Sequence, residues 1–141
     1  MKNLHILPTF ILMVIGILFT TIGYGQSKAD AELYAIWKDK SKPDGDRIKA
    51  YFDRLNDWEM FEDGAKLDNK WFVASDKAIE LALKLDKKEY LPLFYLASSY
   101  NYAMIQSDFE VACSALNKVI ESAKVANASK IPVFMAYIIL S

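Results

Sequence analysis

The sequence predicts an all-α fold in which antiparallel helical hairpins stack into an α-solenoid. The phrase KAIExA at residues 77–82 returns 41 positions later as KVIExA at 118–123, and LPLF at 91–94 returns 40 positions later as IPVF at 131–134. A period of about 40 residues is typical of stacked helical hairpins. Between these phrases, apolar residues recur at spacings of three and four, as on the buried face of a helix. The alternative is an ordinary helical bundle in which the echoes are coincidental.

The N-terminus is predicted to be a signal peptide covering residues 1–25. Lys2 is its only charged side chain, and the stretch Phe10–Phe19 is apolar apart from one glycine. Small residues at Gly23 and Gly25 precede Gln26 by three and one positions, which is the pattern that signal peptidase requires. We therefore expect cleavage between Gly25 and Gln26.

The predicted leader assigns the protein to the periplasm or the extracellular space. The alternative is an uncleaved anchor, because the apolar stretch 4–22 nearly reaches the roughly 20 residues that cross a bilayer. Any membrane contact is expected only through this leader or through a region downstream of residue 141. The remaining 116 residues carry a net charge near −2 and fit one modest domain. They lack the basic excess that binding to nucleic acid requires, so nucleic acid is not expected as a partner.

Residues 26–45 are predicted to form an N-terminal segment with a short helix over 29–37 and a polar linker over 38–45. Asp46 is expected to cap the next helix, because its carboxylate can accept from a free backbone N–H of the first turn. Gly64 is expected to end that helix. Its predicted buried face comprises Ile48, Tyr51, Phe52, Leu55 and Trp58.

The next predicted helix begins at Asp68 or Asn69 and extends to about Leu85, before a polar turn over 86–89. Apolar and small residues recur along it at helical spacing, which predicts one buried face. That face comprises Trp71, Ala74, Ala78, Leu81, Ala82 and Leu85.

Three more elements complete the predicted array. Pro92 lies near the start of a helix to about Ile105, where the N–H that proline lacks is not needed. Asp108 caps the following helix, and Pro132 lies near the start of the last one. The short connections predict antiparallel neighbours. The expected buried face of the Asp108 helix comprises Phe109, Ala112, Cys113, Leu116, Val119, Ile120 and Ala123.

The pattern Leu96-Ala97-x-x-Tyr100 resembles the first helix of a tetratricopeptide repeat, and Asp108-Phe109-x-x-Ala112 resembles the opening of the second. In that family the aromatic residue plugs the hairpin and the alanines allow close helix contact. The separation of Tyr100 and Ala112 is 12 where the family usually has nine, so the first helix is expected to be about one turn longer. The resemblance covers about residues 70–141. It implies that residues 46–141 form a tetratricopeptide-like array whose last repeat is incomplete.

The resemblance also implies a binding surface, because the first helices of such repeats line a concave groove. The positions that match are Phe94, Ser98, Asn101 and Ile105, with Tyr102 near the edge. A neutral groove of this kind favours a protein or peptide partner over an anionic ligand. The alternative is that these residues pack against a neighbouring helix.

Catalysis, cofactors and metal ions are not expected in these residues. The only histidine, His5, lies in the leader, which excludes Ser-His and Cys-His pairs and histidine metal ligands from the mature chain. Carboxylates occur mainly at helix starts and turns, where capping explains them. The single cysteine, Cys113, is expected to be a small buried apolar residue. We therefore expect an extracytoplasmic binding module rather than an enzyme.

A second resemblance gives an alternative function. A leader, a charged linker and a helix ending in KLDKK at 84–88 resemble the extracytoplasmic repeat region of some bacterial sensor histidine kinases and related regulators. This implies the N-terminal sensory region of a longer signal-transduction protein. The stretch Ile131–Leu140 has no charged side chain and is apolar on all sides. We therefore expect a covering helix beyond residue 141, and self-association of the chain without it.

Overall fold

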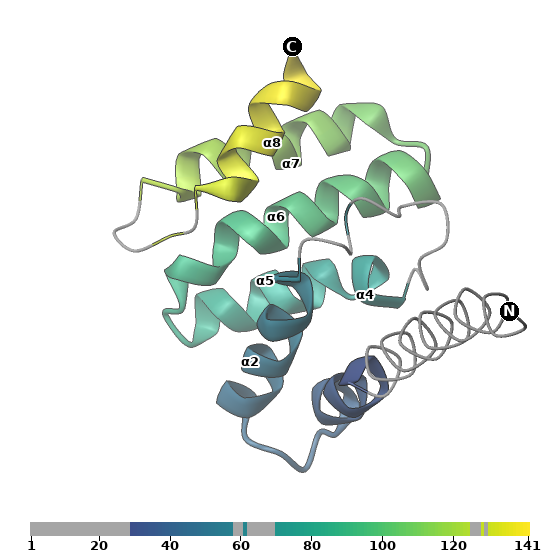
Figure 1. Cartoon of the computed structure of the whole chain (residues 1–141), viewed down its shortest axis with the longest axis vertical. Helices are drawn as coiled ribbons and strands as arrows, with labels where there is room; N and C mark the ends of the chain where they lie inside the picture. Colours follow the sequence, from purple (N-terminus) through teal and green to yellow (C-terminus); the bar gives the residue numbers. More distant parts are fainter. Residues whose placement is uncertain (1–28, 58–60, 62–69, 125–127, 129) are drawn as a thin grey trace, which may run out of the picture.

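The computed structural model describes residues 29–57, 61, 70–124, 128 and 130–141, and every regular element among them is helical (Figure 1). The all-α prediction is confirmed. The elements are helical residues 29–38, α2 (Asp44–Leu55), α4 (Lys70–Val73), α5 (Ser75–Lys84), the 3-10 turn η1 (Lys88–Tyr90), α6 (Leu91–Tyr100), the π-helical turn η2 (Asn101–Ile105), α7 (Phe109–Ser122) and α8 (Ile131–Leu140). The predicted leader with its cleavage site, and the predicted roles of Trp58, Gly64, Asp68 and Asn69, lie outside the described residues.

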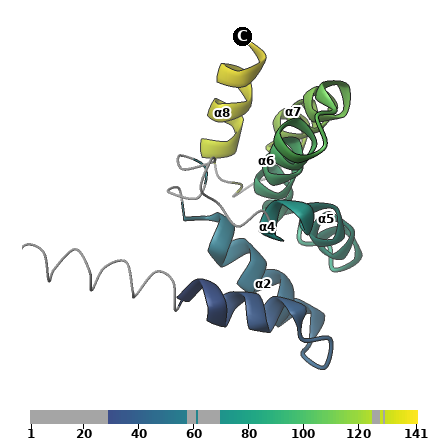
Figure 2. The ribbon, with the colours of Figure 1, turned by 90° about the vertical axis from the view of Figure 1, so that its right-hand side faces the viewer.

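The centre of the molecule is α6, which contacts α5 on one side and α7 on the other. Figure 2 shows these three helices nearly end-on in a row, with α2 and α8 on the same side of that row. α2 contacts α5 and α6, while α8 contacts α6 and α7. Eight of the ten residues of α6 are buried, and this helix contributes more residues to the shared core than any other described helix. No helix in the described ranges has the length and hydropathy to cross a bilayer.

Tyr51 of α2 packs against aromatic residues from three other segments of the chain. Its ring lies 4.7 Å from that of Trp37, 5.6 Å from that of Trp71 and 5.0 Å from that of Phe94, measured between centroids. Its hydroxyl donates to the backbone oxygen of Trp71 at 2.7 Å. Burial raises the pKa of Tyr51 well above its ordinary value. Because a buried hydroxyl needs an acceptor, this contact fixes α4 against α2.

The start of α2 differs from the prediction. The helix begins at Asp44, directly after Pro43, and Asp46 lies inside the first turn without capping it. The backbone N–H of Asp46 bonds instead to the Pro43 oxygen at 3.0 Å. The predicted cap was wrong because the helix begins three residues earlier than expected: Pro43, with φ −52° and ψ 138°, occupies the N-cap position, so Asp46 is the third residue of the helix. α2 also ends at Leu55, well before Gly64.

The helix predicted to extend to Leu85 is divided into α4 and α5 by a turn at Ala74. The end of α5 is closed by two backbone hydrogen bonds, from Lys87 N to Ala82 O at 2.8 Å and from Asp86 N to Leu83 O at 3.2 Å. This pattern is a Schellman motif, which requires a left-handed residue just past the helix. Asp86 occupies that position with φ 55°.

For α7, the predicted cap is confirmed and part of the predicted buried face is wrong. The Asp108 carboxylate accepts from the backbone N–H of Val111 at 3.1 Å, so the predicted cap is confirmed. Cys113 is exposed and Phe109 is 68% exposed, so the predictions that both are buried were wrong. The buried face of α7 is narrow and begins at Ala112: Phe109 lies in the first turn before it, and Cys113 lies beside it. That face comprises Ala112, Ala115, Leu116 and Val119.

Candidate functional site

The predicted groove residues divide into two groups. Phe94, Ser98 and Asn101 are almost fully buried, whereas Tyr102 is half-buried and Ile105 is 37% exposed. Side chains without solvent access cannot line an open groove, so the first three take the alternative role of packing within the fold. Phe94, for example, lies against Tyr51 of α2. A binding role for this set stays a prediction, and its accessible part is reduced to Tyr102 and Ile105.

Two of these residues meet at a carboxylate that the sequence did not indicate. Ser98 Oγ donates to Asp76 Oδ1 at 3.0 Å, and the Tyr102 hydroxyl donates to Asp76 Oδ2 at 2.7 Å. The hydrogen bond to Asp76, together with slight burial, raises the pKa of Tyr102. The tyrosine therefore keeps its proton and acts as a donor, so this cluster holds α5 to α6 rather than supplying a base.

Two buried polar atoms of the described residues, Ser75 Oγ and Asn101 Oδ1, have no hydrogen-bond partner. Each is adjacent in sequence to a member of the Asp76 cluster. η2 also begins at Asn101, and π-helical turns are frequent at functional positions. These features place two unpartnered polar atoms beside the Asp76 cluster, but they do not identify a ligand.

A second carboxylate, Asp30, joins three segments. Its oxygens accept from Arg54 Nε at 2.6 Å, Lys70 Nζ at 2.7 Å and Trp71 Nε1 at 2.8 Å. Burial alone would raise the pKa of Asp30, but the three hydrogen bonds outweigh it and hold that pKa below 3.8. The contacts fix the helical residues 29–38 to α2 and α4, so the role of Asp30 is structural.

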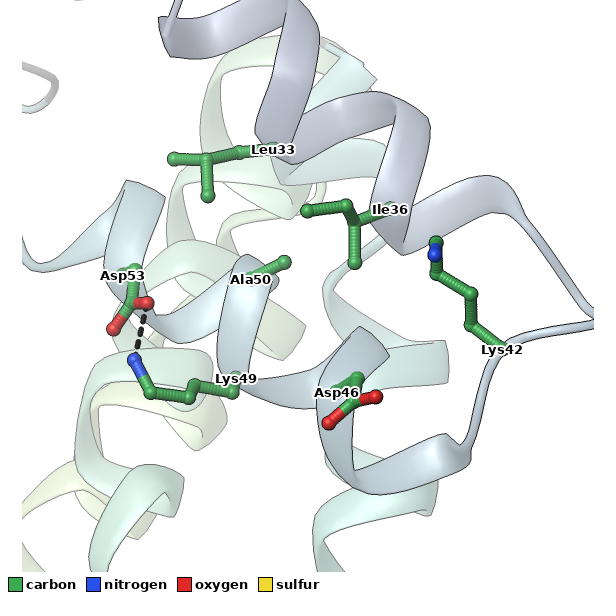
Figure 3. A pocket seen from close by; sticks show the side chains of 7 residues that line it. All are labelled: Leu33, Ile36, Lys42, Asp46, Lys49, Ala50 and Asp53. Atoms are coloured by element: carbon green, nitrogen blue, oxygen red, sulfur yellow. Dashed lines mark hydrogen bonds and ion pairs between the residues drawn. The ribbon is translucent and has the colours of Figure 1, made fainter.

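An open cleft of about 240 Å³ lies between the helical residues 29–38 and α2 (Figure 3). Its apolar lining consists of Leu33, Ile36 and Ala50, and charged side chains form its rim. At one end of the rim, Lys49 Nζ and Asp53 Oδ2 form an ion pair at 2.5 Å. The rim also carries Lys42 and Asp46, so its formal charge is zero and it favours neither an anion nor a cation.

Among the described helices, α8 carries the most exposed large apolar side chains. Phe134 is 66% exposed, Tyr137 58% and Ile138 52%. Their spacing of three and four places them on one side of the helix, which we call the α8 face. The opposite side holds Pro132 and Ala136, which are buried. α8 contacts α6 and α7, so its buried side faces the core and its α8 face points away from it.

Corresponding residues of the two LPLF-like phrases differ in burial between α6 and α8. Phe134 corresponds to Phe94, which is fully buried among the rings of Tyr51, Phe52 and Tyr90. Phe134 has no such enclosure and is mostly exposed. The sequence did indicate this surface, because the uncharged stretch Ile131–Leu140 predicted a helix needing cover. It did not indicate Asp30, Asp76 or the cleft, because lone carboxylates and half-buried aliphatic residues carry no pattern.

No protein-family model, curated protein or solved structure matches this chain. The tetratricopeptide-like assignment therefore stays a prediction. Among the described residues, no group of three or more histidine, cysteine, aspartate or glutamate side chains is placed to hold a metal ion. The α8 face is consequently the candidate functional site, and the chemistry it offers is apolar contact.

Proposed function

We propose that this chain is a non-catalytic, extracytoplasmic helical-repeat module that binds a protein or peptide partner through the α8 face. The observation that carries the proposal is the exposure of Phe134, Tyr137 and Ile138 on one side of a ten-residue helix. Contiguous apolar patches on soluble proteins mark interaction sites. Aromatic side chains in particular dominate the energy of such contacts.

The packing of the helices supports the repeat part of the proposal. Consecutive helices from α5 to α8 contact one another, and α6 also contacts the next-but-one helices on either side of it, α4 and α8. This is the order expected when hairpins stack in sequence. The extracytoplasmic part is supported by the apolar leader and the Gly23-Tyr24-Gly25 pattern.

The test is a titration of fluorescent helical peptides, amphipathic or fully polar, into the purified protein. We expect the amphipathic peptides to bind in preference, and Phe134→Ser to weaken that binding about thirtyfold, because loss of a central aromatic anchor costs about 2 kcal/mol. Leu83→Ser on α5 is the matched control, since Leu83 is also exposed, at 53%, but lies on another helix. Equal binding of both peptide classes, or equal effects of the two variants, would contradict the proposal.

A further inference from the structure

The cleft between the helical residues 29–38 and α2 has walls that are tied together at both ends. Towards the C-terminal end of the first helix, Arg47 Nε donates to the backbone oxygen of Trp37 at 3.1 Å. Towards its N-terminal end, Arg54 Nε donates to Asp30 Oδ1 at 2.6 Å. Because these contacts join the two helices, the cleft is formed before any ligand enters, and binding does not require its walls to be ordered.

The floor of the cleft is apolar and shallow. Leu33 and Ile36 lie three residues apart, and therefore on one side of the first helix, and both point into the cleft with Ala50 of α2 (Figure 3). The volume of about 240 Å³ is smaller than the roughly 300 to 1,000 Å³ of sites for drug-sized ligands. A ligand of this cleft is therefore small and carries one compact aliphatic group.

Two of the four charged side chains on the rim are free to bind a ligand. Lys49 and Asp53 pair with each other, so they neutralise one another. The exposed side chains of Lys42 and Asp46 form no ion pair and no hydrogen bond within the part of the chain that the structure describes. Figure 3 shows them on the side of the cleft away from the Lys49–Asp53 pair. One free cation and one free anion thus border the same apolar floor.

A free α-amino acid with an aliphatic side chain has the three groups that these features require. Its carboxylate can accept from Lys42 Nζ, and its ammonium group can donate to the carboxylate of Asp46. Its side chain can then cover Leu33 and Ile36. A ligand with only one charge would leave one of the two rim charges without a partner.

We propose that this cleft binds a free aliphatic α-amino acid, held between Lys42 and Asp46 with its side chain on the apolar floor. The site is separate from the α8 face, so it adds a small-molecule ligand to the protein or peptide partner proposed there. Because water screens both exposed charges, the complex is weak. We expect a dissociation constant of about 1 mM for leucine.

Two-dimensional amide NMR of the purified protein tests the class of ligand. Leucine, added up to about twentyfold the expected dissociation constant, should cause saturable shifts of the signals of Leu33, Ile36 and Ala50. Three analogues each lack one group: glycine has no aliphatic side chain, isocaproate has no ammonium group and isoamylamine has no carboxylate. Each analogue should bind at least about threefold more weakly than leucine.

Two variants test the rim residues through a crossed pattern of specificity. Lys42→Gln should remove the preference for leucine over isoamylamine, because the cation that binds the carboxylate is absent. Asp46→Asn should remove the preference for leucine over isocaproate, because the anion that binds the ammonium group is absent. Lys77→Gln is the matched control: Lys77 is exposed on α5, away from the cleft, and its loss should change neither preference. Circular dichroism confirms that each variant is folded.

Three outcomes would overturn the proposal. In the first, leucine shifts no signal of the cleft over the whole titration. In the second, isocaproate or isoamylamine binds the wild-type cleft as tightly as leucine does, which would show that the site selects a single charge. In the third, Lys42→Gln and Asp46→Asn keep the wild-type preferences. The peptide titration against the α8 face is a separate measurement, so none of these outcomes changes the function proposed for that face.

Discussion

Single carboxylates hold distant segments of this chain together. Asp30 binds side chains of residues 54, 70 and 71, and Asp76 binds side chains of residues 98 and 102. Hydrogen bonds to a charged group contribute more than neutral ones. The positions of α4 and of the helical residues 29–38 thus depend on the Asp30 side chain, which binds Arg54 and Lys70.

Asp30→Asn should destabilise the protein by about 1 to 3 kcal/mol at neutral pH, because an amide cannot accept three charged or polar donors as a carboxylate does. The pKa of Asp30 in the fold lies below its ordinary value of 3.8. The stabilisation by the carboxylate is therefore complete above about pH 4 and is lost as the pH falls through the lower, folded-state pKa. Urea unfolding of both proteins from neutral pH to acid measures the difference.

The control for this prediction is Asp53→Asn. Asp53 is 41% exposed and its partner among the described residues is Lys49, which is 65% exposed, so screening by water leaves this pair little net effect. Two outcomes would contradict the role assigned to Asp30. In the first, Asp30→Asn destabilises the protein no more than Asp53→Asn does at neutral pH. In the second, the difference in stability between wild type and Asp30→Asn stays the same in strong acid.

At the scale of the element, the ends of the helices show which local signals determined the structure. Asp108 caps α7 as its position predicts, whereas the cap position of α2 is held by Pro43, three residues before Asp46. The Schellman motif after α5 uses Asp86 where glycine is the usual choice. Capping signals in this chain are therefore reliable where one candidate is present and ambiguous where two compete.

Asp108→Ala should lower the free energy of unfolding by about 1 kcal/mol, because the backbone N–H of Val111 loses its acceptor. Asp46→Ala, the matched control, should have little effect, since that carboxylate caps nothing. Thermal or urea unfolding of the two variants measures the contrast. Equal losses would show that the cap of α2 had been assigned to the wrong residue.

On the scale of the whole molecule, α6 decides how the rest is arranged. It is buried against α5 and α7, and both α2 and α8 contact it from one side. Ala97 of α6 is fully buried and Ala112 of α7 is 4% exposed, which agrees with the expectation that small residues lie where helices meet. α8 is the last described helix and its outer face is exposed, which is why the proposed binding function rests on it.

The exported form of the protein should begin at Gln26, because Gly23 and Gly25 supply the small side chains that signal peptidase accepts. Mass spectrometry of the periplasmic or secreted protein measures its N-terminus directly. A variant with Gly25→Leu should retain the leader, since a large side chain does not fit the enzyme's pocket. Recovery of the unaltered chain from Met1 in the membrane fraction would instead support the anchor.

Residue spacing and composition were enough to predict the helical class, the apolar faces of most helices and the cap at Asp108. These depend on spacing and on local hydrogen bonds, which act within one turn of a helix. The sequence also identified Ile131–Leu140 as a stretch too apolar to be a solvated helix. That observation needed only composition.

Which of these residues remain accessible to solvent depends on how the helices pack, and the sequence did not predict it. Phe94, Ser98 and Asn101 were predicted to line a groove, yet α6 is enclosed by its neighbours and buries them. Phe109 and Cys113 were predicted to be buried, yet both are exposed on α7. The physical reason is that periodicity places a side chain on one side of a helix, but exposure depends on how far a second helix, distant in sequence, extends over it.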